Sequence, residues 1–432
     1  MKKLIAILLA LCLVLALAAC GESGGAQNPA GNDPSQANNN TPAPGGNADP
    51  GNGGGNAPAA GSGEPIKIGH IVDLTGNEAL TGAEASRALQ FAVESFGDIA
   101  GRPVQIVEGD AADSSATAGD LARKMVESDG VAAVFGPTQA GEKAAVASYM
   151  NEAEVPVLFY SGTPANLFEG NDWLIGAGGA NPQMPTMMAK YAYEDLGYRT
   201  VNFLTLDNPG FRGFTESFRE VFVALGGTVV GEQYAPFGTA DFSTYLATME
   251  DADAIVAWVT GGSAIALWTQ WYEMGVSERL PILACLASAF TDYFVCDALT
   301  TSAPGAAEAM LGTLAPTMYV YNLDTPENKA FVEAWTAKYG AVPNSSLPGM
   351  IYEAYQLFVE AVEATGGDTT PEVLREAILN AKIDGPAGHL EFGDSTAAVK
   401  DAYVVKVVEL EDGTHNYEIV KEYKNIPPEG VR

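Results

Sequence analysis

The chain alternates short apolar runs with longer stretches of helical spacing, and this alternation limits the folds that it can adopt. Apolar runs such as "IKIGHIV" (66–72) and "VAAVF" (131–135) are each followed by a polar turn and then by an amphipathic segment. Strands that alternate with helices in this way form parallel sheets with helices on both faces. We therefore expect an α/β protein built from βαβ units.

The alternation occurs as two successive sets. The first set has apolar runs within 65–162, and after "GANPQMP" (179–185) a second set has its runs within 200–286. Further helical stretches lie within 326–380, and a β-rich tail closes the chain. Ligands of doubly wound sheets bind at the carboxyl ends of the strands. We expect two doubly wound lobes with a ligand site between them.

The N-terminal segment has the layout of a secretory signal. Residues 1–19 carry Lys2 and Lys3, then an apolar run, then small residues before Cys20. "LALAAC" resembles the lipobox of bacterial lipoproteins, which implies cleavage before Cys20 and its lipidation. The alternatives are a plain signal peptide or an N-terminal anchor helix. Residues 20–64 are rich in Gly, Asn and Pro and predict a disordered linker.

The net charge excludes some classes of partner, and the cysteine content leaves the presence of a disulfide undecided. Lys and Arg number 22 against 54 Asp and Glu, a net charge of −32, which argues against nucleic acid or an anionic membrane surface as a partner. The 47% hydrophobic content supports real cores. Cys285 and Cys296 either form a disulfide or are two buried thiols, and their spacing does not decide between these.

The stretch "VFGPTQAGEKAAV" (134–146) suggests binding rather than catalysis. An apolar strand ends there on small and hydroxyl-bearing residues and a helix follows, so free backbone N–H groups are available to an anion or a carbonyl. The histidines, His70, His389 and His415, are scattered. No zinc-protease, nucleophile-elbow or phosphate-loop motif occurs. We therefore expect no enzyme activity, no metal and no cofactor.

Four segments in this order resemble type I periplasmic binding proteins of the branched-chain amino acid and amide group. They are "IKIGHIVDLTGNEALTGAEASRALQFAVE", "VAAVFGPTQAG", "VPVLFYSGTPANL" and "GPAGHLEFGD". The resemblance covers 65–432 and implies a fold of two parallel-sheet lobes joined by three crossovers. These are expected near Gly179–Pro182, Gly312–Pro316 and Asp384–Gly388. The N-terminal lobe is then 65–181 plus 316–384, and the C-terminal lobe 182–315 plus 385–432.

The resemblance also implies a set of ligand-binding residues. Ser161, Gly162 and Thr163 match the segment that holds a ligand carboxylate in relatives, although their hydroxyls could instead cap the next helix. Phe211 matches an aromatic that covers the ligand, with packing of a first helical turn as the alternative. The full predicted set is Thr75, Glu78, Leu80, Gln139, Ala140, Ser161, Gly162, Thr163, Asn181, Phe211, Ser263 and Leu286.

Two positions depart from the amino-acid-binding pattern. Relatives usually hold the ligand ammonium with an acidic residue where this chain has Leu286, and Asn181 occupies a position that is often Asp. An unpaired buried ammonium costs several kcal/mol. Either Glu78, Asp207 or another carboxylate takes this role, or the ligand carries no ammonium.

Other conspicuous residues have structural explanations. Trp258, Trp268 and Trp271 are expected in the core, because two of them lie three apart on one helix and the third is inside a strand. The acidic segment 108–115 lacks the spacing of a calcium loop. It predicts a solvated loop with a helix N-cap at Asp113 or Ser114.

Together these features predict a substrate-binding lipoprotein of an ABC importer. It would be monomeric, lie outside the cytoplasm, be held to the membrane through Cys20, and deliver a small polar solute to permease subunits. An amino acid, an amide and a small carboxylate all remain open as ligands. The alternative is a receptor that feeds a signalling partner, and a third, weaker possibility is an extracellular hydrolase.

Overall fold

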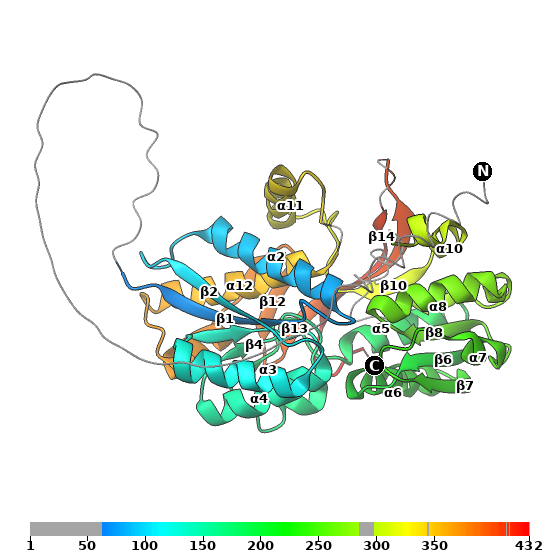
Figure 1. Ribbon diagram of the computed structural model, residues 1–432, viewed down its shortest axis with the longest axis horizontal. Helices are drawn as coiled ribbons and strands as arrows, with labels where there is room; N and C mark the ends of the chain where they lie inside the picture. The colour runs from blue at the N-terminus through cyan, green and yellow to red at the C-terminus, as the bar shows by residue number, and fades with distance from the viewer. Residues whose placement is uncertain (1–62, 285–297, 344, 412, 414, 432) are drawn as a thin grey trace, which may run out of the picture. The chain divides into compact units, whose positions relative to one another are not determined.

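The computed structural model describes residues 63–284, 298–343, 345–411, 413 and 415–431 (Figure 1). The signal segment, Cys20, most of the linker, Cys285, Leu286 and Cys296 lie outside these ranges. The strands are β1 (Ile66–Val72), β2 (Val104–Asp110), β3 (Ala133–Phe135), β4 (Val157–Leu158), β5 (Leu174–Ile175), β6 (Thr200–Leu206), β7 (Thr228–Ala235), β8 (Ala254–Trp258), β9 (Ile282–Ala284), β10 (Leu314–Thr317), β11 (Ile383–Gly385), β12 (Gly388–Phe392), β13 (Ala398–Glu409) and β14 (His415–Ile426).

Most of the connections between strands are helical. The helices are α2 (Ala79–Phe96), α3 (Ser115–Lys124), α4 (Ala140–Ala153), α5 (Gln183–Glu194), α6 (Pro209–Ala224), α7 (Ser243–Ala247), α8 (Gly261–Glu273), α10 (Pro304–Met310), α11 (Pro326–Tyr339), α12 (Leu347–Ala364) and α13 (Pro371–Asn380), with short turns η1 (Met125–Asp129), η2 (Ala165–Phe168) and η3 (Val276–Glu278). Within the described ranges, none of these helices has the length and apolar character that crossing a bilayer requires.

The first sheet is parallel, with strand order β2-β1-β3-β4-β5. Ile68 of β1 lies opposite Ile106 on one side and Ala133 on the other. In Figure 1, α3 and α4 cover one face of this sheet, and α2 and α12 cover the other. Because both faces are covered, β1 and β3 are mostly apolar, as the sequence predicted. The exceptions are Lys67 and His70 of β1, which contact Asp129 O at 2.9 Å and Glu108 Oε2 at 3.1 Å.

The second sheet is also parallel, with order β7-β6-β8-β9, and α6 and α8 lie on its opposite faces (Figure 1). Trp258 of β8 and Trp268 and Trp271 of α8 are all buried. The rings of Trp268 and Trp271 meet edge to face with centroids 5.2 Å apart. The prediction that these tryptophans are core residues is confirmed.

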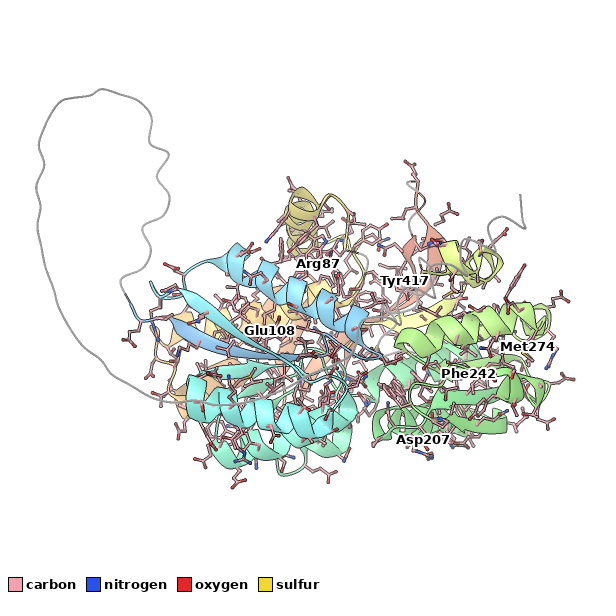
Figure 2. The ribbon with its side chains drawn as sticks, in the orientation of Figure 1. Arg87, Glu108, Asp207, Phe242, Met274 and Tyr417 are labelled. Carbon is pink, nitrogen blue, oxygen red and sulfur yellow. The ribbon has the colours of Figure 1, made fainter. Side chains whose placement is uncertain are left out.

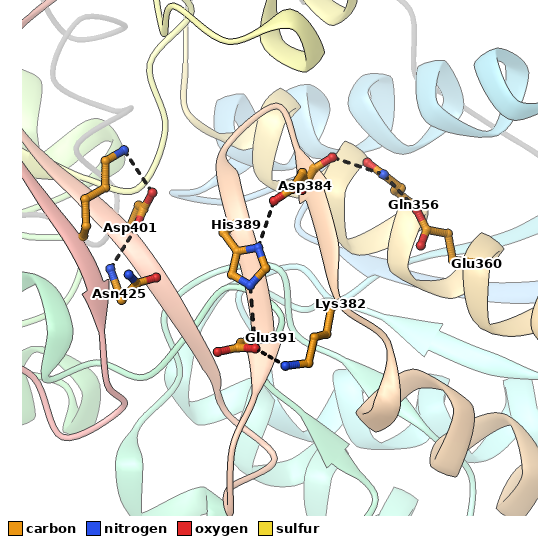
Figure 3. A network of polar contacts seen from close by, with 9 residues as sticks. Gln356, Glu360, Lys382, Asp384, His389, Glu391, Asp401 and Asn425 are labelled. Carbon is orange, nitrogen blue, oxygen red and sulfur yellow. Dashed lines mark hydrogen bonds and ion pairs between the residues drawn. The ribbon is translucent and has the colours of Figure 1, made fainter.

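A third sheet is antiparallel and has the order β10-β13-β12-β11, with β14 also paired to β13. The sequence predicted a β-rich tail but not that β10 and β11 join it in one sheet. Exposed polar contacts join the strands in Figure 3: His389 Nδ1 lies 2.8 Å from Asp384 Oδ1, and Lys382 Nζ lies 2.6 Å from Glu391 Oε2. The predicted lobe boundaries divide this sheet and stay a prediction.

One buried side chain ties the start of α5 to the third sheet. Gln183 has no exposed surface, and its Nε2 donates to the carbonyl oxygens of Ala398 (3.1 Å) and Ile426 (2.7 Å). Its Oε1 accepts the backbone N–H of Ala180 at 2.8 Å. Both ends of the amide are therefore satisfied by backbone from three separate segments.

Candidate functional site

A cavity of about 50 Å³ lies between residues that follow strands of the first sheet and residues that follow strands of the second. This is the edge at which ligands bind in doubly wound folds. The residues that line it are Glu78, Thr81, Thr138, Gln139, Ala140, Ser161, Gly162, Asn181, Asn208, Gly210, Phe211, Phe214 and Thr260.

Helix N-termini supply much of this lining. Gln139, Asn208 and Thr260 are the N-cap residues of α4, α6 and α8. Asn208 Oδ1 accepts the N–H of Phe211 at 2.9 Å. The first turns of these helices carry N–H groups without partners inside the helix, and the helix dipole makes them attractive to negative charge. The cavity therefore suits an anionic or carbonyl-bearing ligand.

The N-termini of α4 and α6 approach each other closely. A Cβ atom placed on Gly210 would lie 2.7 Å from the Cβ of Ala140, which is shorter than real carbon contacts. Glycine at this position therefore permits the two helix ends to meet.

Glu78 connects the two sides of the cavity. Its buried carboxylate accepts hydrogen bonds from Thr260 Oγ1 at 2.8 Å, Thr81 Oγ1 at 3.0 Å and Asn77 Nδ2 at 3.0 Å. Burial raises the pKa of this carboxyl, while the hydrogen bonds from the two threonines act in the opposite direction. Among the described residues that line the cavity, Glu78 is the ionisable group.

The segment after β4 lies against the residues that precede α5. The N–H of Thr163 donates to Gly179 O at 3.1 Å, and the N–H of Asn181 donates to Thr163 O at 2.7 Å. Ser161 and Gly162 line the cavity, and no side-chain hydrogen bond caps the turn η2 that follows. The alternative that these hydroxyls cap the next helix is therefore wrong.

Asn181 shows where a ligand group fits. Its side chain is 4% exposed, and its Oδ1 has no hydrogen-bond partner within the described part of the chain. A buried polar atom without a partner costs free energy. This amide oxygen is therefore available to a ligand donor.

The structure brings most of the predicted site residues to the cavity but not all. Glu78, Gln139, Ala140, Ser161, Gly162, Asn181 and Phe211 line it. Thr75 and Leu80 are exposed, Thr163 and Ser263 are buried, and none of these four lines the cavity. Leu286 lies outside the described residues.

Phe211 both packs against the core and faces the cavity. It lines the cavity, and it also stacks on Phe214, with ring centroids 6.1 Å apart. Phe214 in turn stacks on Trp258 at 4.9 Å. Packing and ligand cover are therefore not exclusive here, because the aromatic stack continues from the core to the cavity.

Asp207 does not serve as the substitute acid at the cavity. It is exposed (Figure 2) and its Oδ1 accepts a hydrogen bond from Arg212 Nε at 2.6 Å. This hydrogen bond lowers the pKa of the Asp207 carboxyl. Asp207 is absent from the cavity lining, and Glu78 is the carboxylate among the described residues that lines the cavity.

Sequence reasoning missed a group of cavity residues, among them Thr81, Thr138, Asn208, Gly210, Phe214 and Thr260. Two of these residues could have been predicted from the sequence. Asn208 before Pro209, and Thr260 before Gly261, each follow an apolar strand and begin a helix, which is the pattern of an N-cap at a sheet edge.

The acidic segment 108–115 holds the first loop of the site. Asp110 accepts the N–H of Leu74 and the hydroxyl of Thr75, both at 2.8 Å. Asp113 accepts the N–H of Asn77, and Ser114 caps α3 through the N–H of Thr117. The cap at Ser114 is confirmed. The expected solvated loop is confirmed in part, because Ala112 and Ser115 are exposed. Residues 108–110, however, belong to β2, and Asp110 and Asp113 accept hydrogen bonds from the backbone before Glu78.

Residues 65–414 match the family model described as periplasmic binding protein. The chain belongs to this family. The Leu/Ile/Val-binding protein homolog 6 of Brucella melitensis is 22% identical over 380 residues, which cover 85% of this chain and 94% of that protein. The family and this relative are binding proteins, which confirms that the chain is not an enzyme.

Solved structures give the same fold. An ABC transporter substrate-binding protein from Sphaerobacter thermophilus is 29% identical, with a TM-score of 0.75 over 84% of this chain and 99% of that one. A solute binding protein of an ABC transporter from R. palustris, in complex with benzoate, is 22% identical, with a TM-score of 0.71 over 82% and 96%. The predicted type I periplasmic binding protein fold is confirmed. Among the described residues, no cluster of three His, Cys, Asp or Glu side chains is suited to a metal ion.

Proposed function

We propose that this periplasmic binding protein is the substrate-binding lipoprotein of an ABC importer and captures a small solute that carries a carboxylate. The observation that carries the proposal is the cavity, in which the N-termini of α4, α6 and α8 meet the Ser161–Gly162 backbone. The ligand carboxylate lies against these N–H groups and the Ser161 hydroxyl. Phe211 and Phe214 cover the apolar part of the ligand.

The bound solute is then delivered to the importer by a protein anchored at the membrane. The lipid on Cys20 holds the protein outside the cytoplasm, the 20–64 linker lets the body move, and the closed monomer docks on permease subunits. The family membership supports the transport role. The lobe ranges 65–181 plus 316–384 and 182–315 plus 385–432 give the two bodies that close on the ligand.

A thermal-shift screen of the full chain tests the ligand class. The screen compares leucine, isoleucine and valine with benzoate, with aliphatic carboxylates that lack an amine, and with the matching amides. A ligand at a hundredfold excess over its Kd stabilises the folded state by about 2.7 kcal/mol, which a melting curve detects. A carboxylate should raise the melting temperature, and a screen without any carboxylate hit would contradict the proposal.

Two variants locate the hit in the cavity. Ser161→Ala should weaken the shift because a hydroxyl donor is lost, whereas Ser115→Ala, at an exposed position of α3, should leave it unchanged. An unchanged shift in S161A would place the ligand elsewhere.

Glu78→Gln separates the two ligand types. If the hit is an amino acid, removing this buried carboxylate should weaken binding by about tenfold or more, since a charge-assisted hydrogen bond contributes roughly 1.5–3 kcal/mol. If the hit lacks an amine, affinity should hold or improve, because a buried negative charge is removed. Isothermal titration of wild-type and E78Q protein with the same compound measures the difference.

A further inference from the structure

A lysine is buried directly behind the segment that lines the cavity. Lys143 lies in the first turns of α4 and has no exposed surface. Its Nζ donates to Ser161 O (2.9 Å), Ser161 Oγ (2.9 Å) and Gly162 O (2.7 Å), and it lies 3.4 Å from Thr163 Oγ1. The three shorter contacts use all three of its protons.

The partners of Lys143 are neutral oxygens, so its charge lacks a direct counter-ion. The ring of Phe159 lies 5.3 Å from Nζ and adds only a weak attraction. The ionisable neighbour that acts on it is Glu142. Burial, followed by the carboxylates of Asp73, Asp113 and Glu78, raises the pKa of Glu142 to about 9. Glu142 is therefore protonated at neutral pH and does not balance the ammonium.

The contacts also set the direction of the Ser161 hydroxyl. Because Ser161 Oγ accepts a hydrogen bond from Lys143 Nζ, its own hydroxyl proton is free to point elsewhere, and Ser161 lines the cavity. Thr163 Oγ1 donates to Ser161 O at 3.2 Å. This hydrogen bond holds residues 161–163 together. The lysine thus leaves Ser161 as a donor toward a ligand.

We propose that Lys143 is the specificity-determining residue for an anionic ligand group: it positions Ser161 and Gly162 and supplies the positive charge that the ligand carboxylate balances. This rests on the proposed function and deepens it. The site should then prefer a carboxylate over the amide of the same shape, because an amide satisfies the donors but leaves the buried charge unpaired.

Two acid–amide pairs test this by isothermal titration of the full chain: leucine with leucinamide, and benzoate with benzamide. Wild-type protein should bind at least one acid about tenfold or more tightly than its amide. In Lys143→Met, which keeps the length and removes the charge, the acid should weaken about tenfold or more while the amide changes less than about threefold. The preference for the acid should then disappear.

The outcomes separate the two proposals. If neither acid binds wild-type protein, the proposed ligand class is wrong and the inference falls with it. If an acid binds but K143M weakens acid and amide equally, Lys143 is only a structural support, and the inference alone is overturned. Lys124→Met, at an exposed position of α3, is the matched control and should change neither affinity.

The pH dependence of wild-type binding gives an independent test if K143M does not fold. Burial lowers the pKa of Lys143 to about 7, so above this pH the empty site must take up a proton to bind an anion. The Kd of the acid should rise between pH 7 and pH 8.5 by up to about tenfold per unit. Benzamide does not titrate, so its Kd should stay constant. A flat acid profile would overturn the inference.

Discussion

The two walls of the cavity differ in the forces that hold them together. The wall that follows the first sheet, here called the charged wall, contains buried ionisable side chains. Glu78 lines the cavity, and Asp73 after β1 and Glu142 and Lys143 of α4 are buried as well. The wall that follows the second sheet is built from aromatic packing, in which Phe211, Phe214 and Trp258 stack in sequence. Hydrogen bonds are directional, so the charged wall is suited to orienting a ligand. The aromatic wall offers apolar contact area with little preference for orientation.

The largest effect is expected on the aromatic wall. Phe214→Ala should lower the free energy of unfolding by about 3–5 kcal/mol, because a ring that is 2% exposed is removed from between Phe211 and Trp258. Urea unfolding measures it. Phe237→Ala, at a position 36% exposed, is the control and should cost less than about 0.5 kcal/mol. Equal losses in both variants would mean that the stack is not a stability element.

The charged wall should respond to pH instead. The pKa of Glu142 is raised to about 9 and that of Asp73 is also raised, chiefly by burial. The folded protein therefore keeps protons that the unfolded chain releases above about pH 4.5, so the free energy of unfolding should fall as pH rises from 5 to 9, by up to about 1.4 kcal/mol per unit for one proton.

Glu142→Gln tests this directly. In this variant the free energy of unfolding should fall less steeply with pH, by up to the contribution of one proton. Glu152→Gln, exposed on the same helix, should keep the wild-type slope. Urea unfolding at pH 5, 7 and 9 gives the three slopes. An unchanged slope in E142Q would show that the carboxyl is ionised in the folded state.

The smallest effect is expected where the walls meet. Thr260→Val removes the 2.8 Å hydrogen bond to Glu78 but leaves the carboxylate its bonds to Thr81 and Asn77. We expect a loss of about 0.5–1.5 kcal/mol in unfolding free energy. Thr248→Val, at an exposed position, is the control. A loss of several kcal/mol in T260V would mean that this contact dominates the join between the walls.

The sequence predicted the parallel sheets because β1, β3, β6 and β8 are buried along most of their length and so are mostly apolar. The third sheet was not predicted, because pairing of β10 with β13 joins segments far apart in the chain and leaves no local pattern. Within the site, Ser161 and Gly162 were predicted through the resemblance of "VPVLFYSGTPANL" to relatives. Lys143 was missed, because an isolated lysine in a helical run has the same appearance whether it is exposed or buried.

The double hydrogen bond of Gln183 has a consequence for the order in which the chain folds. Its partners, Ala398 of β13 and Ile426 of β14, lie 215 and 243 residues further along the chain, so this buried amide is satisfied only when these distant strands have folded back against α5. Contacts of such large sequence separation form late, since the loop between them must close first. The start of α5 is therefore expected to reach its native packing late in folding, once β13 and β14 are in place.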